Sequence, residues 1–292
     1  MSIDYLHDRI RKLRSPVILD FSMKQELLPS HLLEQEGSFS KAYCRFCQEL
    51  MTAASEFVPG VRFTFDTFAL LGADGLSALK QLLKRAKELG LYVLLDAPQI
   101  LSPWDADMIA NTLFDGDGFA CDGLVISPYI GSDAIKPFVP YCNQKEKDLF
   151  VIVRSPNKSA SELQDLLSGK RLVHGVAAEI SNRFGEGIFT KCGYSRIASV
   201  VSAGSAESIS TLRARYKHMF LLVDGLDYPS GNAKNCSYAF DRFGYGAAIS
   251  VGPTITAAWK TGENYSEKDY IKAAMDAIER IRKNLQRYFT IL

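Results

Sequence analysis

Eight short apolar runs alternate with longer amphipathic stretches along the whole chain. The runs are almost entirely apolar, which is typical of parallel strands that are buried on both faces. They cover Val17–Asp20, Val61–Phe65, Leu91–Asp96, Gly123–Ser127, Leu149–Arg154, Ile197–Val201, Met219–Asp224 and Gly246–Ser250. Between them lie helical patterns such as Gly75–Leu89, whose leucines form one stripe. Eight strands, each followed by a helix, favour a closed barrel over a doubly wound sheet.

The length of the chain fits one such barrel with added segments. The chain has 292 residues, and a (β/α)8 barrel typically needs about 250. A helical pattern over Ile3–Arg14 precedes the first strand, and the fifth strand-helix unit carries an extra stretch, Ser159–Lys191. We therefore predict an α/β fold, a single (β/α)8 barrel domain over residues 1–292, with an N-terminal helix and an extended fifth unit.

Charge and hydropathy exclude two classes of partner. The net charge is +1 and the basic residues are scattered, so the chain has no electrostatic footprint for nucleic acid or an acidic membrane. The first 14 residues are charged and amphipathic and lack the apolar core of a signal peptide. No apolar run approaches the roughly 20 residues of a membrane span. We expect a cytoplasmic protein.

Cysteine and histidine spacing does not indicate a metal or redox site. Among six cysteines only Cys44 and Cys47 are suggestively spaced, and they lie in a helical pattern, Lys41–Ala54, without a second pair. Buried apolar residues are the better interpretation of both. The four histidines have no partners at metal-ligand spacing: His7, His31, His174 and His218. We predict no metal.

Polar residues gather where the predicted strands end. They are Asp20, Asp96, Ser127, Arg154–Asn157, Asp224 and Ser250. In (β/α)8 barrels the carboxyl ends of the strands carry the active site. Any single Asp there could simply cap the following helix, but several at once favour a ligand pocket at the barrel mouth.

Three segments carry a family resemblance. Val93–Ala97 reads VLLDA, Pro128–Asp133 reads PYIGSD and Val151–Asn157 reads VIVRSPN. In this order and spacing they resemble the bacterial subfamily-2 orotidine 5′-phosphate decarboxylases, which carry LDAKRGDIG, NPYLGxD and V(R/K)TSNP. The similarity spans almost the whole chain and continues through Lys136–Phe138, Val200–Gly204 and Ala257–Trp259.

The resemblance implies an enzyme of pyrimidine nucleotide biosynthesis that removes CO2 from orotidine 5′-phosphate to give UMP. It implies no cofactor and a homodimer that pairs barrel mouths. The family uses a Lys-Asp-Lys-Asp array in which one Asp crowds the departing carboxylate and one Lys protonates the carbanion. The last Asp comes from the neighbouring subunit. An anion that develops on carbon needs such a preorganised cation.

Three of the four positions of this array are replaced in the chain. Asp20 matches the family's nucleoside-contacting Asp, Arg62 replaces the first Lys, and Asp96 matches the first Asp of the motif. Pro98 replaces the proton-donating Lys, and Leu101 replaces the second Asp. Proline has neither a charge nor a proton to donate. Asp96 and Arg62 remain as catalytic candidates.

The phosphate end of the implied pocket is also altered. The family has PGxGAQGG after the seventh strand and the Arg of SRGI after the eighth, where this chain has Pro229 for the Gln and Val251 for the Arg. Asp224 and Asp227 add carboxylates, and a like charge near phosphate costs about 1–4 kcal/mol. Pro156 replaces the pyrimidine-contacting Ser. The remaining ligand-binding candidates are Asp20, Ser155, Asn157 and the glycines of an anion nest, Gly225, Gly231 and Gly252.

Three functional hypotheses follow. The first, which the lost proton donor favours, is a non-catalytic paralogue retained for binding or for assembly with a pyrimidine-pathway protein. The second is an enzyme of different chemistry that uses Asp20, Arg62 and Asp96.

The third hypothesis is a working decarboxylase in which Asp105 or Asp107 stands in for the lost Asp and an unidentified group stands in for the lost Lys. Both are explained more simply as first-turn acids of a helix that starts near Trp104.

Overall fold

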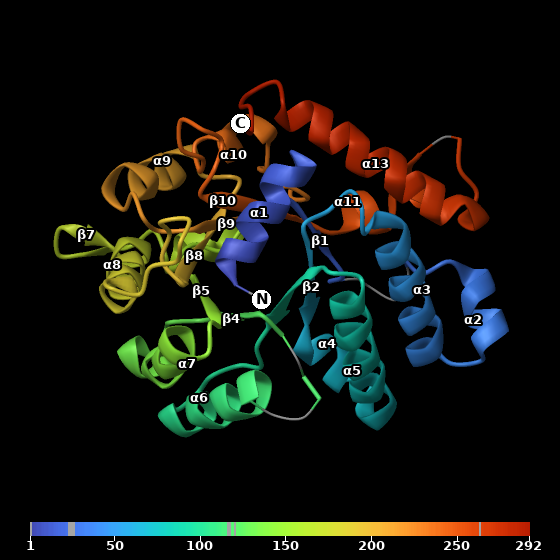
Figure 1. Ribbon diagram of the computed structural model, residues 1–292, viewed down its shortest axis with the longest axis horizontal. Helices are drawn as coiled ribbons and strands as arrows, with labels where there is room; N and C mark the ends of the chain where they lie inside the picture. The colour runs from blue at the N-terminus through green and yellow to red at the C-terminus, as the bar shows by residue number, and fades with distance from the viewer. Residues whose placement is uncertain (1, 23–26, 116–117, 120, 263) are drawn as a thin grey trace.

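The computed structural model describes residues 2–22, 27–115, 118–119, 121–262 and 264–292. Its centre is a closed barrel of eight parallel strands in the order β1-β10-β9-β8-β5-β4-β3-β2 (Figure 1). The predicted (β/α)8 fold is confirmed, and each strand lies within two residues of its predicted bounds. The strands are β1 (Val17–Asp20), β2 (Gly60–Thr64), β3 (Tyr92–Asp96), β4 (Gly123–Ile126), β5 (Asp148–Ile152), β8 (Ile197–Ser202), β9 (Leu221–Asp224) and β10 (Ala247–Val251).

Helices surround this barrel. They are α1 (Ile3–Leu13), α2 (Ser30–Glu36), α3 (Phe39–Ala54), α4 (Phe65–Ala69), α5 (Gly72–Glu88), α6 (Pro103–Ala110), α7 (Val139–Gln144), α8 (Val173–Gly185), α9 (Ala206–Arg215), α10 (Ala233–Ser237), α11 (Pro253–Thr256), α12 (Ala258–Thr261) and α13 (Tyr270–Leu285). Shorter helical turns are η2 (Asn111–Asp115), η3 (Gly131–Ala134), η4 (Lys136–Phe138), η5 (Lys158–Glu162) and η6 (Glu267–Asp269). Cys44 and Cys47 are buried in α3, in agreement with the apolar interpretation. Across the described residues, none of these helices has the length and apolarity to cross a membrane.

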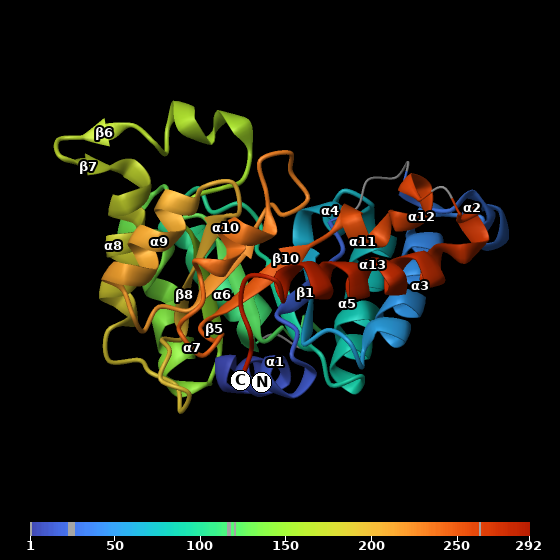
Figure 2. The same ribbon diagram turned by 90° about the horizontal axis from the view of Figure 1, so that it is seen from above.

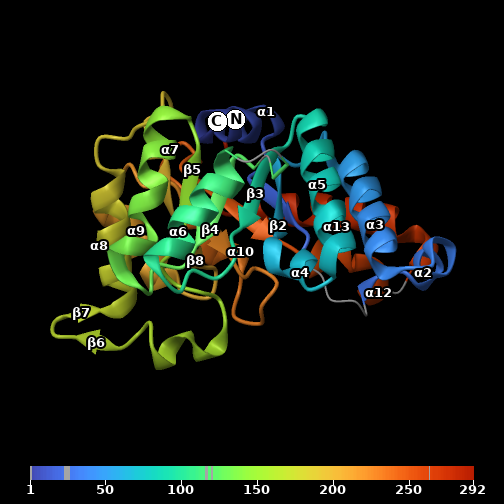
Figure 3. The ribbon, with the colours of Figure 1, turned by 90° about the horizontal axis from the view of Figure 1, so that it is seen from below.

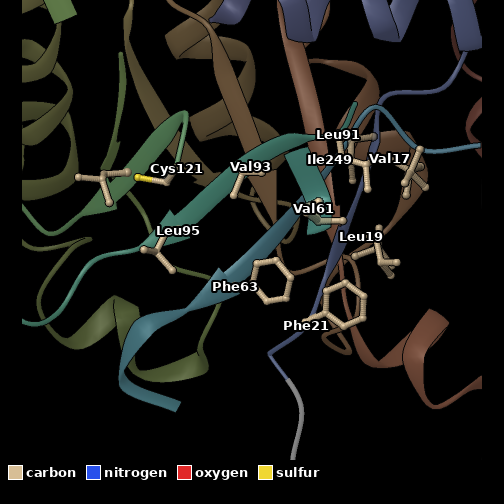
Figure 4. Close-up of a cluster of buried hydrophobic side chains, with 14 of the residues drawn as sticks. Val17, Leu19, Phe21, Val61, Phe63, Leu91, Val93, Leu95, Cys121 and Ile249 are labelled. Carbon is tan, nitrogen blue, oxygen red and sulfur yellow. The ribbon is translucent and has the colours of Figure 1, made fainter. Parts of the chain in front are cut away.

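The apolar side chains along the strands belong alternately to two cores, because successive side chains point to opposite faces of a sheet. Val17, Val61, Val93 and Ile249 belong to the outer core between strands and helices (Figure 4). Their neighbours point into the barrel, where the inner core contains Ile18, Leu94, Val200, Leu222 and Ala248. The period of two therefore decides which residues of each strand face the barrel axis.

The predicted N-terminal helix is confirmed and closes one end of the barrel. Ile3, Leu6 and Ile10 of α1 are fully or almost fully buried and join the inner core together with Ile291 near the C-terminus. Figure 2 shows α1 and both chain termini on the same side of the molecule. The amino ends of the strands are thus covered, and the mouth at their carboxyl ends is left for ligands.

The predicted extension of the fifth unit is also confirmed. Between β5 and β8 the chain forms η5, a small antiparallel hairpin of β6 (Leu167–Ser168) and β7 (Arg171–Leu172), and α8. Figures 2 and 3 both show this hairpin on the side of the molecule opposite α1. The extension therefore lies beside the mouth.

Candidate functional site at the barrel mouth

The inward-facing positions at the carboxyl ends of four strands are polar and meet at the mouth. Asp20, Asp96 and Ser250 each follow an inner-core residue of the same strand by two positions, so the alternation of β1, β3 and β10 points them into the barrel. Arg62 lies between two outer-core residues of β2 and therefore also points inward. Asp224, at the end of β9, joins them two residues after the inner-core Leu222. The structure thus brings both predicted catalytic residues, Asp96 and Arg62, into one cluster.

Arg62 is the centre of this cluster and is only 6% exposed. Its Nε and Nη2 donate to the two carboxylate oxygens of Asp96 at 2.7 and 2.9 Å. Its Nη1 donates to Asp224 Oδ2 at 2.9 Å and to Ser250 Oγ at 3.1 Å, and lies 3.3 Å from Asp20 Oδ2. Ser250 in turn donates to Asp20 at 2.9 Å. Four hydrogen bonds from the guanidinium therefore go to groups of its own chain.

The charges in this cluster do not balance. Three carboxylates, Asp20, Asp96 and Asp224, surround one guanidinium, so the fully ionised cluster carries a net charge of 1 − 3 = −2. Burial disfavours the charged form of Arg62, but the three carboxylates outweigh it and raise the pKa of Arg62. Burial also raises the pKa of Asp96 to about 6, against the opposing effect of Arg62. The mouth therefore takes up a proton as the pH falls through about 6.

The amides of the three glycines predicted to form an anion nest all donate to acceptors of the same chain. The two carboxylate oxygens of Asp227 accept hydrogen bonds from the amides of Gly252 and Thr254, each at 2.7 Å. The amide of Gly225 donates to Asp224 Oδ1 at 2.7 Å, and that of Gly231 to the carbonyl of Tyr228 at 2.9 Å. Asp227 thus stands where a bound anion would use these amides, an arrangement that the sequence analysis did not predict.

Two of these glycines are required by the tight packing of the loop. Gly225 has a φ of 85°, and a Cβ there would lie 2.2 Å from Cβ of Pro156. A Cβ on Gly231 would lie 2.2 Å from the carbonyl oxygen of Gly225. The loop between β9 and α10 is therefore folded against itself and against the segment that follows β5, which accounts for these glycines without a ligand.

Val251 points away from the mouth. It is fully buried in the outer core, because the alternation of β10 turns Ser250 inward and its neighbour outward. A buried valine at this position offers no group to an anion.

The segment after β5 is also tied internally. Ser155 Oγ donates to Asn157 Oδ1 at 2.6 Å and accepts from Gln164 Nε2 at 2.8 Å. Arg154 donates from Nε and Nη2 to both carboxylate oxygens of Asp165 at 2.9 and 2.8 Å. Gln164 and Asp165 were missed by the sequence analysis, since they lie in the extension, where the family motifs give no guidance.

The segment after β3 offers no replacement for the lost Lys and Asp. Leu101 is 69% exposed, and its amide donates to Asp105 Oδ2 at 3.1 Å. The amide of Asp105 donates to Ser102 Oγ at 3.3 Å, so the two side chains cap the first turn of α6. The interpretation as a first-turn acid is confirmed for Asp105, whereas Asp107 lies beyond the first turn of α6, so it is wrong for Asp107. Within the described part of the chain, no group of three or more His, Cys, Asp or Glu side chains could hold a metal ion.

Curated relatives share almost the whole length of this chain. An orotidine 5′-phosphate decarboxylase of Clostridium novyi is 28% identical over 286 residues, which is 98% of both chains. One from Clostridium acetobutylicum is 29% identical over 291 residues, covering 98% of this chain and all of the relative. No protein-family model matches the chain.

Solved structures share the fold. The orotidine 5′-monophosphate decarboxylase of Plasmodium berghei superposes with a TM-score of 0.75 at 15% identity, over 97% of this chain and 99% of the other. The UMP synthase of Leishmania donovani superposes with a TM-score of 0.73 at 25% identity, over 97% of this chain and 57% of the other.

The chain is a (β/α)8 barrel protein. Its charged cluster lies at the carboxyl ends of the strands, where proteins of this class have their functional sites. The relatives align with this barrel from end to end. By sequence over almost its whole length and by fold, the chain is similar to the orotidine 5′-phosphate decarboxylases.

Proposed function

We propose that residues 1–292 form a single-domain, cytoplasmic, cofactor-free member of this family that does not decarboxylate orotidine 5′-phosphate. Its barrel would serve binding or assembly, with a protein of the pyrimidine pathway as the expected partner. Pro98 at the place of the proton donor supports this proposal. So does Arg62, whose donors are directed to three carboxylates and a serine of the same chain.

The observation that carries the proposal is the position of Asp227. Its carboxylate holds the amides of Gly252 and Thr254 with two hydrogen bonds of 2.7 Å. A phosphate would have to displace this carboxylate and then lie beside a like charge. Because the family uses phosphate binding to act at a distant reacting carbon, the loss of this contact weakens catalysis as well as affinity.

We predict that UMP binds with millimolar affinity or weaker, which corresponds to at most about 4 kcal/mol of binding free energy. Isothermal titration of the full chain with UMP and with inorganic phosphate measures this. The Asp227→Ala variant is expected to bind UMP at least about tenfold more tightly, since two amides become free for a charge-assisted contact.

Asp66→Ala is the matched control for this titration. It removes an exposed carboxylate from the first turn of α4, beside the mouth, without freeing the two amides. Its UMP affinity should equal that of the unaltered chain. Micromolar binding by the unaltered chain would contradict the proposal and indicate a retained nucleotide pocket.

We also propose that the protein is a homodimer that pairs barrel mouths. Leu101, Trp104 and Met108 are spaced by three and four residues around α6 and are 69%, 81% and 70% exposed. An apolar stripe of this kind at the mouth is suited to burial in an interface.

The dimer proposal predicts that Trp104→Glu shifts the protein to monomer in light scattering at micromolar concentration. Phe57→Glu, at another exposed aromatic residue (46% exposed) that precedes β2, should leave the mass unchanged. A monomer mass for the unaltered chain would disprove the dimer.

A further inference from the structure

A second polar cluster lies outside the mouth cluster, between the extension of the fifth unit and α9. Asp165, His174 and Ser208 come from the segment after η5, the first turn of α8 and the first turn of α9. All three line a single cavity of about 470 Å³. They are a carboxylate, an imidazole and a hydroxyl group in one recess, and none of them belongs to the Arg62 cluster.

The three side chains are arranged in a chain of contacts. His174 Nε2 lies 3.4 Å from Ser208 Oγ. His174 Nδ1 lies 3.2 Å from Asp165 Oδ1 and 3.0 Å from the carbonyl oxygen of Gln164. Because two acceptors face Nδ1, the neutral imidazole carries its proton there, and the unprotonated Nε2 faces the serine. This is the order of roles in a nucleophile, base and orienting acid.

The carboxylate at the end of this chain is fixed and ionised. Arg154 donates to both oxygens of Asp165, and these hydrogen bonds hold the pKa of Asp165 below its ordinary value. His174 itself is only 7% exposed, so its ring is confined by packing as well as by hydrogen bonds. A rigid carboxylate of this kind keeps an imidazole in one tautomer and one orientation.

The hydroxyl group of Ser208 is oriented from its other side. Ser205 Oγ donates to Ser208 Oγ at 2.7 Å. With one lone pair occupied by this bond, the proton of Ser208 is free to point toward His174 Nε2. The 3.4 Å separation is within the looser range that such pairs show before a substrate binds.

The surroundings indicate what the cavity could accept. The first turn of α9 lines it at Ser205 and Glu207, and the leading amides of an α-helix have no acceptor within the helix. The amide of Ser208 donates to Ser205 Oγ at 3.4 Å, so the amides of Ala206 and Glu207 are the ones suited to stabilising an oxyanion.

Lys170, Arg171 and Arg215 line the cavity together with the carboxylates of Asp165 and Glu207, which leaves an excess of one positive charge. Arg171 also pairs with Glu179 at 3.0 Å. The remaining positive charge favours a substrate with an anionic group.

We propose that Ser208, His174 and Asp165 form a hydrolytic site for small esters that carry an anionic group. Ser208 Oγ attacks the acyl carbon while His174 Nε2 takes the serine proton. The bond to the leaving alcohol then breaks, and His174 returns the proton to that alcohol. A water molecule next attacks the acyl-serine, gives a proton to His174, and releases the carboxylic acid while the proton returns to Ser208. The complete cycle consumes one ester and one water molecule and releases one alcohol and one carboxylic acid.

Labelling of the full chain with a fluorophosphonate probe, followed by peptide mass spectrometry, tests the proposal. The expected result is one adduct, on Ser208. Ser208→Ala should abolish it, and His174→Gln should slow labelling by about 100-fold or more, the range for loss of a general base. Ser210→Ala is the matched control, since Ser210 is exposed on the same helix and donates to the carbonyl of Glu207; its labelling should be unchanged.

Turnover gives a second readout. The unaltered chain should hydrolyse p-nitrophenyl hemisuccinate in preference to p-nitrophenyl acetate, and Arg171→Gln should reduce that preference. Absence of an adduct on Ser208 in the folded, unaltered protein would overturn the proposal, whatever the stability of the variants. Labelling of His174→Gln at the unaltered rate would also overturn it, because the serine would then react without its base.

Discussion

The purified protein is expected to leave orotidine 5′-phosphate unconverted, at a rate indistinguishable from that of the uncatalysed reaction. Pro98 has no proton for the carbanion, and Arg62, at the place of the family's first Lys, is held by Asp96, Asp224 and Asp20. Loss of one member of a cooperating catalytic set typically costs several orders of magnitude, and the loss of further members adds little. The fall in absorbance that accompanies conversion to UMP measures the rate.

Pro98→Lys alone should restore no activity. The new lysine would lack the second Asp, because that position is Leu101. It would also lack the family's phosphate-binding Arg, because Val251 stands there and is buried in the outer core. Pro98→Lys combined with Leu101→Asp is the matched comparison and should also fail while Asp227 holds the amides of the nest.

The control for this assay is expression in a host that lacks its own decarboxylase. Turnover near 1 s⁻¹, which is within the usual range for enzymes, would show that the proposed loss of function is wrong. Turnover of a different substrate would instead support other chemistry built on Asp20, Arg62 and Asp96.

Replacement of Arg62 by methionine is expected to lower the free energy of unfolding by about 3–5 kcal/mol, the cost of removing one partner from a buried ion pair. The substitution would leave Asp20, Asp96 and Asp224 close together without the cation that all three contact. Urea denaturation followed by circular dichroism measures the loss.

A quadruple variant distinguishes the contribution of the Arg62 charge to stability from the contribution of its packing. Arg62→Met combined with Asp20→Asn, Asp96→Asn and Asp224→Asn should recover most of the lost stability, because no uncompensated charge remains. Asp133→Asn, at an exposed carboxylate that pairs with Lys136, should change stability by less than about 1 kcal/mol. Equal destabilisation of the single and quadruple variants would show that Arg62 stabilises the barrel by packing alone.

The fold could be predicted from the sequence because its signal is local and repeated. Each strand appears as a short apolar run and each long helix as an apolar stripe, and eight repetitions leave few alternative topologies. The same runs locate the strand ends, and the strand ends place Asp20, Asp96 and Asp224 at one mouth.

The partners of these residues could not be predicted, because they depend on contacts between distant segments. Arg62 meets Asp224 across 162 positions of sequence, and Asp227 meets Gly252 across 25. Sequence spacing shows that Asp227 adds a negative charge, but not that its carboxylate folds onto the amides. The pairing of Arg154 with Asp165 was hidden for the same reason, since the conformation of the extension decides it.

Both chain ends lie at the covered end of the barrel, so an attachment at either end orients the molecule in the same way. Ile3 and Ile291 pack in the same inner core at the covered end of the barrel, on the side opposite the β6–β7 hairpin (Figure 2). A tether attached to either end therefore pulls on the closed base of the barrel. Molecules immobilised in this way, or fused to another protein through either end, present the Arg62 cluster and the hairpin outward, toward whatever approaches from solution.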